Sequence, residues 1–171
     1  MVELRIRNRS RLRLKEIEEL AEKIQSEYGT ASIFGPEEPL ERGHQDEADV
    51  LLLGNEIIGV FHEGRAGLGV RGLLKYPATK RYVTVDMGAV RFVTNGADIM
   101  GPGIVDADPL IKVGDLVWVR EERHGKPLAV GVALADGPTL KAKTKGKQVK
   151  SLHFVGDRLW LWGQEEPEAG A

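Results

Sequence analysis

Two hydrophobic patterns follow one another at the N-terminus, an alternation and then a helical spacing. Between Leu4 and Lys15, arginines alternate with other residues, which predicts a strand with arginines on one face and Leu4 and Ile6 on the other. From about Ser10 apolar residues recur every three or four positions, so we expect a helix that Ser10 caps and Gly29 ends. The basic run is either a solvated strand face or an edge that binds phosphate.

The rest of the first half contains one clear hairpin signal. Residues 29–49 are polar and contain Gly, Pro and several acids, which favours an irregular connection. Val50–Leu53 and Glu56–Phe61 are apolar runs separated by Gly54-Asn55, a pair that favours hairpin turns. A short helix is expected just before Pro77, because proline disfavours helical geometry in the residue that precedes it.

A second unit starts near Arg81 and is dominated by short strand patterns. We expect strands at Tyr82–Val85, Leu116–Arg120, Leu128–Leu134, Val149–Val155 and Arg158–Trp162. A short helix is expected over 88–95, with Gly96 as its left-handed stop, and Asp108-Pro109 predicts a further helical turn. Little helix among closely spaced strands indicates a small barrel or rolled sheet. We therefore expect domains at 1–79 and 80–162, followed by an acidic, disordered tail at 163–171.

Composition restricts the classes of function. The 171 residues include no cysteine, which excludes disulfides, thiolate zinc sites and cysteine nucleophiles. A chain without cysteine fits a reducing compartment, and no apolar run approaches the ~20 residues that cross a bilayer, so we expect a cytoplasmic protein without a membrane span. The formal net charge of −2 conceals an asymmetry, because residues 80–162 carry 13 Lys and Arg against 9 Asp and Glu. This basic half is compatible with a polyanionic partner.

No constellation of residues in the sequence supports catalysis, a cofactor or a metal. Gly67–Gly72 matches the dinucleotide pattern G-x-G-x-x-G, but Pro77 leaves barely one helical turn after it. We interpret this segment as a flexible connection between the two halves. The four histidines are scattered, helix capping is the simpler explanation of Asp106 and Asp108, and the serines lie outside any nucleophile motif. We therefore expect a protein that is not an enzyme.

The stretch 85–104, VDMGAVRFVTNGADIMGPGI, carries the strongest functional signal. It runs from a strand through a short helix into a loop with several glycines. Glycines let a main chain approach a ligand closely and direct successive amides toward it. Phosphate or sugar oxygens suit such a loop, and a tight connection within a compact β fold is the alternative.

This stretch, together with GDLVWV and the GKQVK…HFVGDRLWLW ending, resembles a PUA domain, the RNA-binding module of pseudouridine synthases and archaeosine transglycosylases. VLLLGNEIIGVF and LLKYP extend the resemblance upstream. Residues 50–162 are thus similar to the two-domain malignant T-cell-amplified protein family and its archaeal homologues, whereas residues 1–49 match poorly. The resemblance implies an α+β protein, with a small N-terminal α/β pre-PUA domain before a PUA pseudobarrel of about six strands with short helices.

The same resemblance implies a function. It indicates a non-catalytic RNA-binding protein that recognises structured RNA, either the tRNA acceptor end or small-subunit rRNA, in translation initiation or ribosome recycling. Family members pair with the density-regulated protein on the small ribosomal subunit, so a similar partner is expected. The alternative is an accessory subunit that presents RNA to a tRNA or rRNA modification enzyme.

Two groups of residues are expected at the RNA face. The motif supplies Gly96, Ala97, Asp98, Met100, Gly101, Pro102 and Gly103. Cations expected to attract phosphates are Lys80, Arg81, Arg91, Lys145 and Lys147. Met100 and Pro102 are expected to pack on a ribose or base while the loop amides bind oxygens. The three tryptophans are expected in the core rather than as stacking platforms.

Overall fold

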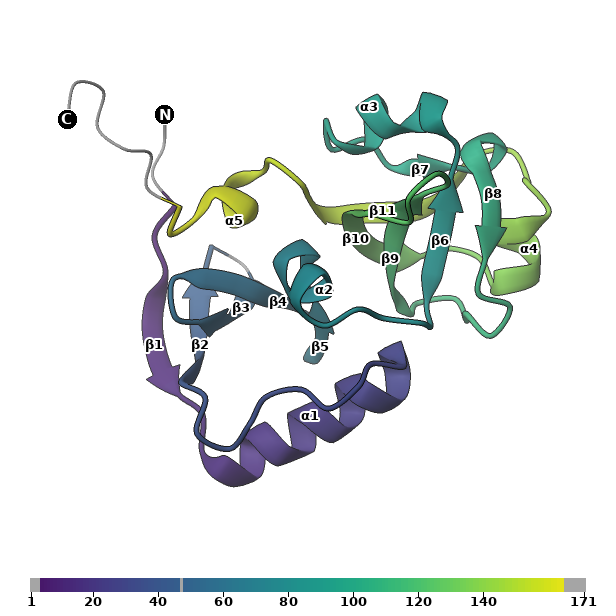
Figure 1. Ribbon diagram of the computed structural model, residues 1–171. Coiled ribbons are helices and arrows are strands. Elements are labelled where there is room, and N and C mark those ends of the chain that lie inside the picture. Colours follow the sequence, from purple (N-terminus) through teal and green to yellow (C-terminus); the bar gives the residue numbers. More distant parts are fainter. Residues whose placement is uncertain (1–3, 47, 165–171) are drawn as a thin grey trace, which may run out of the picture.

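The computed structural model describes residues 4–46 and 48–164, which form two β-sheets connected by short helices (Figure 1). The first sheet contains β1 (Arg7–Arg11), β2 (Leu40–Gln45), β3 (Ala48–Leu53), β4 (Glu56–His62) and β5 (Arg65–Leu68). The second contains β6 (Tyr82–Val85), β7 (Ile99–Met100), β8 (Ile104–Ala107), β9 (Leu116–Glu121), β10 (Pro127–Ala133) and β11 (Lys147–Phe154). The helices are α1 (Leu14–Tyr28), α2 (Val70–Lys75), η1 (Met87–Ala89), α3 (Val90–Val93), η2 (Gly101–Gly103), α4 (Gly137–Lys141) and α5 (Arg158–Leu161).

Helix α1 covers one face of the first sheet. Ile17, Ala21, Ile24 and Tyr28 of this helix are buried and pack on the sheet, whereas Leu14 is exposed. Gly29 ends the helix with φ of +64°. The expected cap at Ser10 is wrong, because Ser10 lies in β1 and pairs with Arg42 of β2. The helix begins after Arg13, whose amide donates to Glu16 Oε1 at 3.1 Å. Strand pairing therefore displaces a local capping signal.

Strand β1 does not keep all of its arginines on one face, contrary to the alternating sequence pattern. Asn8 has φ of +54° and the pairing register with β2 shifts there, as in a β-bulge. Ile6 and the stem of Arg9 consequently lie together over Gly43 of β2. Arg9 also donates two hydrogen bonds to Glu41, at 3.1 and 2.7 Å. The bulge thus divides the arginines between the two faces of the sheet, because Arg7 pairs with His44 and Arg11 with Glu41, three residues apart in β2.

The predicted hairpin is confirmed, whereas the predicted irregular connection before it is wrong. Strands β3 and β4 pair across Gly54, which has φ of +60°. Strand β2 occupies part of the stretch 29–49 and pairs with β1 on one side and β3 on the other. Its sequence LERGHQ has weak strand propensity, so this element depends on its two neighbours.

The G-x-G-x-x-G segment is wrongly predicted as a flexible connection. Gly67 belongs to β5, and Gly72 is buried in α2 against the main chain of Ile58 in β4. A side chain at Gly72 would collide with the Ile58 carbonyl. These glycines therefore permit close packing of main chains rather than motion.

The second sheet forms a nearly closed pseudobarrel of six strands in the order β7-β11-β10-β9-β6-β8. The two outermost strands, β7 and β8, are joined in sequence only by η2, so the glycine segment connects the two ends of the sheet. Valines and leucines of these strands fill the interior. Sequence patterns miss β7, β8 and α4, which have two, four and five residues.

Two local predictions in this unit fail for the same reason. Asp108 does not start a helix; its carboxylate accepts the amides of Arg81, at 2.6 Å, and Leu110, at 3.0 Å, in a turn. The predicted strand at the C-terminal end is helix α5, because Asp157 caps it by accepting the Trp160 amide at 2.9 Å. In both segments an aspartate carboxylate that accepts main-chain amides sets the local conformation.

The two sheets share residues across their interface. Trp118 and Val130 of the second sheet belong to the apolar core beneath α1, and the Trp118 indole donates to the Lys80 carbonyl at 2.8 Å. On the other face of the first sheet, Leu159 and Trp162 from the α5 region pack with residues of β3 and β4. The boundary predicted at residue 79 stays a prediction. Residues 165–171 of the predicted tail lie outside the described residues.

The tryptophans lie in two environments. Trp118 is buried, as expected for a core residue. Trp160 and Trp162 are partly exposed, and guanidinium groups stack on both rings, that of Arg71 on Trp160 at 3.8 Å and that of Arg9 on Trp162 at 5.5 Å. No helix in the described ranges is long and apolar enough to cross a membrane.

Candidate nucleic-acid interface

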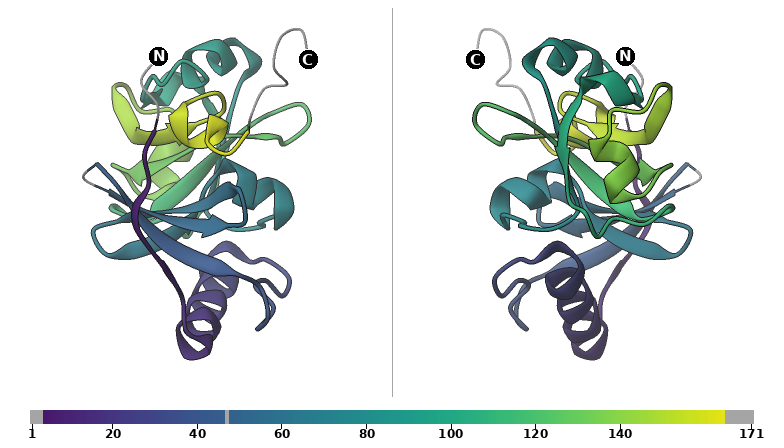
Figure 2. Two further views of the ribbon diagram at one scale, coloured as in Figure 1. Left: turned by 90° about the vertical axis from the view of Figure 1, so that its left-hand side faces the viewer. Right: turned by 90° about the vertical axis from the view of Figure 1, so that its right-hand side faces the viewer.

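An apolar pocket of about 330 Å³ opens beside the glycine segment. It lies between η1 and α3 on one side and β7 and η2 on the other. The teal helical segment over residues 87–93 lies at the end of the molecule opposite α1 (Figure 2). Its lining consists of Val85, Ala89, Phe92, Val93, Ala97, Asp98, Ile99, Met100 and Gly103. One acidic residue among apolar neighbours makes the pocket suitable for a flat, weakly polar group.

Two large apolar side chains stand exposed in the pocket wall. Phe92 is 54% exposed and Met100 is 50% exposed, although both are apolar. The guanidinium of Arg91 lies 4.8 Å from the Phe92 ring centre. Phe92 is absent from the residues predicted from the sequence; the signal that identifies it is an aromatic residue beside an arginine in the helix of the motif. An exposed phenyl ring next to a cation is a combination that nucleobases and phosphates recognise.

The glycines of the motif differ in what their surroundings allow. The amides of Gly96, Ala97 and Gly101 all donate to carbonyls of the protein itself, that of Gly101 to Gly146 at 2.9 Å. A side chain at Gly101 would collide with the main chain of Thr144. The sequence-based expectation that these amides bind ligand oxygens is therefore wrong. The Gly96 and Ala97 amides bond to carbonyls of α3, and the Gly101 amide holds the segment against the loop that precedes β11.

Gly103 is the glycine that faces the pocket. Its carbonyl accepts the Asp86 amide at 2.9 Å, which fixes the segment to the end of β6. The Asp86 carboxylate in turn accepts the Ala89 amide at 2.9 Å and starts η1. A side chain at Gly103 would point toward the methyl of Ala89, 3.4 Å away, and so into the pocket. Pro102 next to it is exposed.

Asp98 connects β7 to β11 and positions a cation. One carboxylate oxygen accepts the Ser151 amide at 2.8 Å, and the other pairs with Lys147 Nζ at 3.0 Å. The Lys147 side chain, followed by the Ser151 amide, lowers the pKa of Asp98 below its ordinary value of 3.8. The Asp98 carboxylate therefore neutralises part of the positive charge that Lys147 contributes to the interface.

The Asp98 contacts give a testable pH dependence. Because the pKa is lower in the folded state, the stabilisation is complete above the ordinary pKa and disappears as the pH falls through the folded value. We expect Asp98→Asn to lose less unfolding free energy than the wild type between about pH 5 and pH 3. Urea titrations at each pH measure this, with the 77% exposed Glu63 changed to Gln as control. Parallel curves for Asp98→Asn and the wild type would contradict the assignment.

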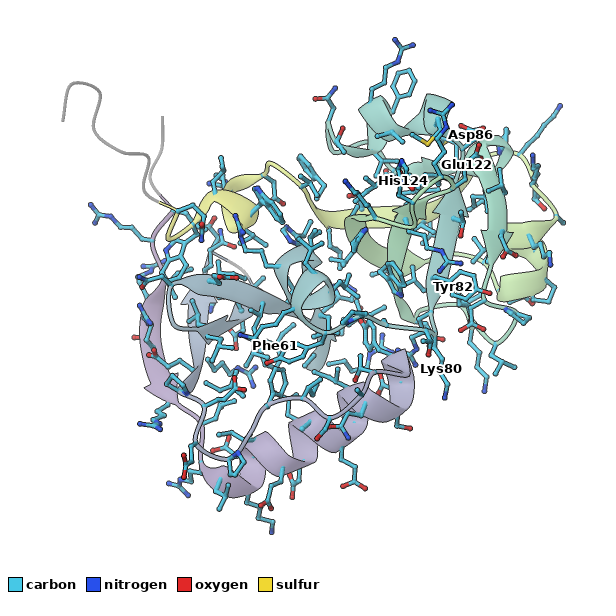
Figure 3. The ribbon with its side chains drawn as sticks, in the orientation of Figure 1. Phe61, Lys80, Tyr82, Asp86, Glu122 and His124 are labelled. Atoms are coloured by element: carbon cyan, nitrogen blue, oxygen red, sulfur yellow. The ribbon has the colours of Figure 1, made fainter. Side chains whose placement is uncertain are left out.

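The structure separates the predicted cations into two places. Arg91 is exposed in α3, and Lys145 is exposed in the loop before β11, where the Gly146 carbonyl accepts the Gly101 amide. Together with Lys147, these two cations flank the pocket. Lys80 lies at the opposite end of β6 from Asp86 (Figure 3). The predicted site is therefore divided by the length of that strand.

Lys80 and Arg81 serve the junction between the sheets. Arg81 pairs with Glu27 of α1 at 2.8 Å and lies 3.7 Å from Asp115. Lys80 Nζ donates to the carbonyl of Ser26 at 3.2 Å. These contacts hold α1 against the start of the second sheet, so both cations have structural partners there.

Among residues 4–46 and 48–164, no group of three or more His, Asp or Glu side chains is arranged to hold a metal ion. The buried carboxylate–imidazole pair of Asp157 and His153 is instead a structural contact, described below. The pocket itself has apolar walls, with cationic side chains at its margins.

A six-stranded pseudobarrel closed by this glycine segment is the PUA fold, and the PUA domain family model matches residues 81–155. The chain also resembles a solved structure of a conserved PUA domain protein from Thermoplasma acidophilum. That likeness has a TM-score of 0.73 at 31% identity and covers 89% of this chain and 97% of the other.

Relatives that match more of the chain or carry descriptive names define the family further. The uncharacterized protein MJ1432 of Methanocaldococcus jannaschii is 37% identical over 158 residues, covering 92% of this chain and 98% of its own. Translation machinery-associated protein 20 of Saccharomyces cerevisiae is 33% identical over 97 residues, 53% of this chain and 54% of the yeast protein. Malignant T-cell-amplified sequence 2 of Homo sapiens is 30% identical over 121 residues, 67% and 66% of the two chains.

The chain therefore belongs to the PUA-domain family that includes MJ1432, translation machinery-associated protein 20 and the malignant T-cell-amplified proteins. The resemblance inferred from the sequence motifs is confirmed, as is the α+β fold with its pseudobarrel. The match spans about half of the yeast relative and two thirds of the human one.

Proposed function

We propose that this protein binds structured RNA without catalysing a reaction, through the surface around the pocket, and that it acts in translation. The observation that carries the proposal is the apolar pocket with exposed Phe92 and Met100 in its wall and cations at its margins. Such a surface accepts an unstacked base against the ring while neighbouring cations contact the phosphates. The end of a tRNA acceptor arm and an exposed nucleotide of small-subunit rRNA both offer an unstacked base.

The family supports the biological setting of this proposal. Two relatives carry names that connect them with the translation machinery or with malignant T-cell amplification. We propose a cytoplasmic role in translation initiation or ribosome recycling, with the small ribosomal subunit and a density-regulated-protein-like chain as partners. Mass spectrometry of material purified with the tagged protein tests this role, because ribosomal proteins support it and an RNA-modification enzyme indicates the accessory-subunit alternative.

Filling the pocket tests RNA binding directly. Replacing Gly103 with leucine directs a side chain toward Ala89 inside the pocket, where a base would lie. We expect the affinity for deacylated tRNA to fall by about tenfold or more, since stacking of one base contributes about 1–3 kcal/mol. Fluorescence anisotropy at fixed salt measures the affinity, and thermal unfolding verifies the fold.

Gly35→Leu is the matched control for this experiment. Gly35 lies in the connection before β2, away from the pocket. A Cβ added at Gly35 would have Glu38 Cγ as its nearest neighbour, 3.9 Å away. We expect it to bind tRNA as the wild type does. If folded Gly103→Leu binds tRNA with unchanged affinity, the pocket does not hold RNA.

A further inference from the structure

The outer edge of the first sheet carries an unusual concentration of uncompensated positive charge. Five arginines occur between residues 5 and 13, with no acidic residue among them. All five are exposed, and β1 is fully exposed along its length. Arg9 is already bound to Glu41. The remaining four, Arg5, Arg7, Arg11 and Arg13, are here called the arginine edge.

Acidic groups close to the arginine edge bond to main-chain amides or to other residues; Glu16 accepts the main-chain amide of Arg13 at 3.1 Å. Both carboxylate oxygens of Glu41, the β2 residue opposite Arg11, accept hydrogen bonds from Arg9. Asp49 of β3 accepts from Arg42 at 2.7 Å and contacts His44 at 2.8 Å. Within residues 4–46 and 48–164, the arginine edge makes no ion pair. Its positive field is therefore directed to solvent.

The strand that carries these arginines is also a free edge of the sheet. Strand β1 is the first of the five strands, and within the described part of the chain it pairs with β2 alone. Its outward main-chain amides are consequently available as hydrogen-bond donors beside the guanidinium groups. Guanidinium groups and main-chain amides both contact phosphate oxygens in nucleic-acid complexes.

We propose that the arginine edge is a second RNA-contact surface, which binds the phosphate backbone of the same RNA that the pocket binds. The inference rests on the proposed function. Strand β1 lies on the side of the molecule away from α3 and α4 (Figure 1). One RNA that reaches both surfaces must therefore extend across the molecule, as a folded tRNA or a ribosomal helix does and a short oligonucleotide does not.

A triple substitution, Arg7→Gln, Arg11→Gln and Arg13→Gln, tests the arginine edge. We expect the affinity for deacylated tRNA to fall by about tenfold at physiological salt. The slope of log affinity against log salt should decrease by about 1 for each arginine that contacts a phosphate. Binding of a six-nucleotide RNA with the tRNA 3′ sequence should stay unchanged, because it reaches only the pocket.

The matched control removes three exposed lysines elsewhere, by Lys23→Gln, Lys75→Gln and Lys112→Gln. It changes the net charge equally and should alter tRNA affinity much less than the arginine triple. An equal loss in both triples, or an equal loss for tRNA and the six-nucleotide RNA, would show general electrostatic attraction and overturn the second surface. Unchanged tRNA binding of the arginine triple would show that the arginines only protect the sheet edge from strand pairing.

The two proposals fail in distinguishable ways. If the wild type binds neither RNA, the proposed function fails and the arginine edge has no RNA to contact. If the wild type binds tRNA and only Gly103→Leu weakens it, the pocket is retained and the second surface is rejected. If Gly103→Leu and the arginine triple each weaken tRNA binding, and the arginine triple binds the six-nucleotide RNA as the wild type does, the results support both the pocket and the second surface.

Discussion

Replacing His153 with alanine is expected to lower the free energy of unfolding by about 3 to 4 kcal/mol. The imidazole is 1% exposed, and its Nδ1 lies 2.8 Å from the Asp157 carboxylate. Its Nε2 accepts the amide of Val70, the first residue of α2, at 3.2 Å. A neutral ring that donates from Nδ1 satisfies both contacts. One side chain of the second sheet therefore pairs with both the α5 cap and the first unit.

The alanine variant loses more than packing, because it removes the hydrogen bond of the Val70 amide and one of the hydrogen bonds that the Asp157 carboxylate accepts. Burial acts to raise the pKa of Asp157, but hydrogen bonds from His153 and from the Trp160 and Phe154 amides outweigh it, so the pKa lies below its ordinary value. Without His153, this carboxylate and the Val70 amide stay buried with fewer hydrogen bonds. Urea unfolding followed by tryptophan fluorescence and by far-ultraviolet circular dichroism measures the loss.

His44→Ala is the control for this prediction. His44 Nδ1 lies at the same 2.8 Å from a carboxylate, that of Asp49, but the His44 side chain is 41% exposed. Water replaces its hydrogen bonds after substitution, so we expect a cost below about 1 kcal/mol. Equal losses in the two variants would show that burial of His153 has no particular role.

Sequence patterns identify those helices and strands whose conformation is set by residues within the same segment. The stripe of α1, its glycine stop and the β3–β4 hairpin all follow from spacing and turn residues, and all are present. Strand β6 is predicted with its observed bounds because its valines are buried and β-branched. In each element, local preference and tertiary packing favour the same conformation.

Elements that depend on distant partners are the ones that sequence patterns miss. Strand β2 forms because β1 and β3 flank it, and β7 forms because β11 is beside it. The α5 segment has the composition of a strand, yet Asp157 and the apolar surface of β3 and β4 stabilise a helix there. Periodicity within a short segment contains no information about such neighbours.

The candidate site also contains residues whose positions follow from the local sequence and residues whose positions depend on distant partners. The motif residues cluster because they are contiguous, and the structure gathers Arg91, Lys145 and Lys147 around them. Lys80 and Arg81 are close to the motif in sequence but at the other end of β6. Whether a glycine amide is free or already bonded depends on the partner strand, which the sequence does not specify.

Gly72→Val is expected to destabilise the protein by about 3 kcal/mol or more, because there is no space for a side chain where α2 meets β4. A Cβ at Gly72 would collide with the Ile58 carbonyl and lie 3.1 Å from Leu68 Cδ2. Main-chain atoms of a central strand cannot move aside as the end of a flexible side chain can. Because α2 also contacts β10, its displacement should weaken the junction between the two sheets.

The measurement that distinguishes this close packing from a flexible connection is a comparison of two glycine substitutions. Gly88 lies in the short helix η1, where a new Cβ meets its nearest neighbour, Asp86 Oδ1, at 3.4 Å. Gly88→Ala should therefore change the unfolding free energy by less than about 1 kcal/mol. If urea unfolding shows Gly72→Val to be as stable as Gly88→Ala, α2 does not dock through its glycine. A loss confined to Gly72→Val instead explains why a dinucleotide-like motif occurs in a protein that uses it for helix-to-strand packing.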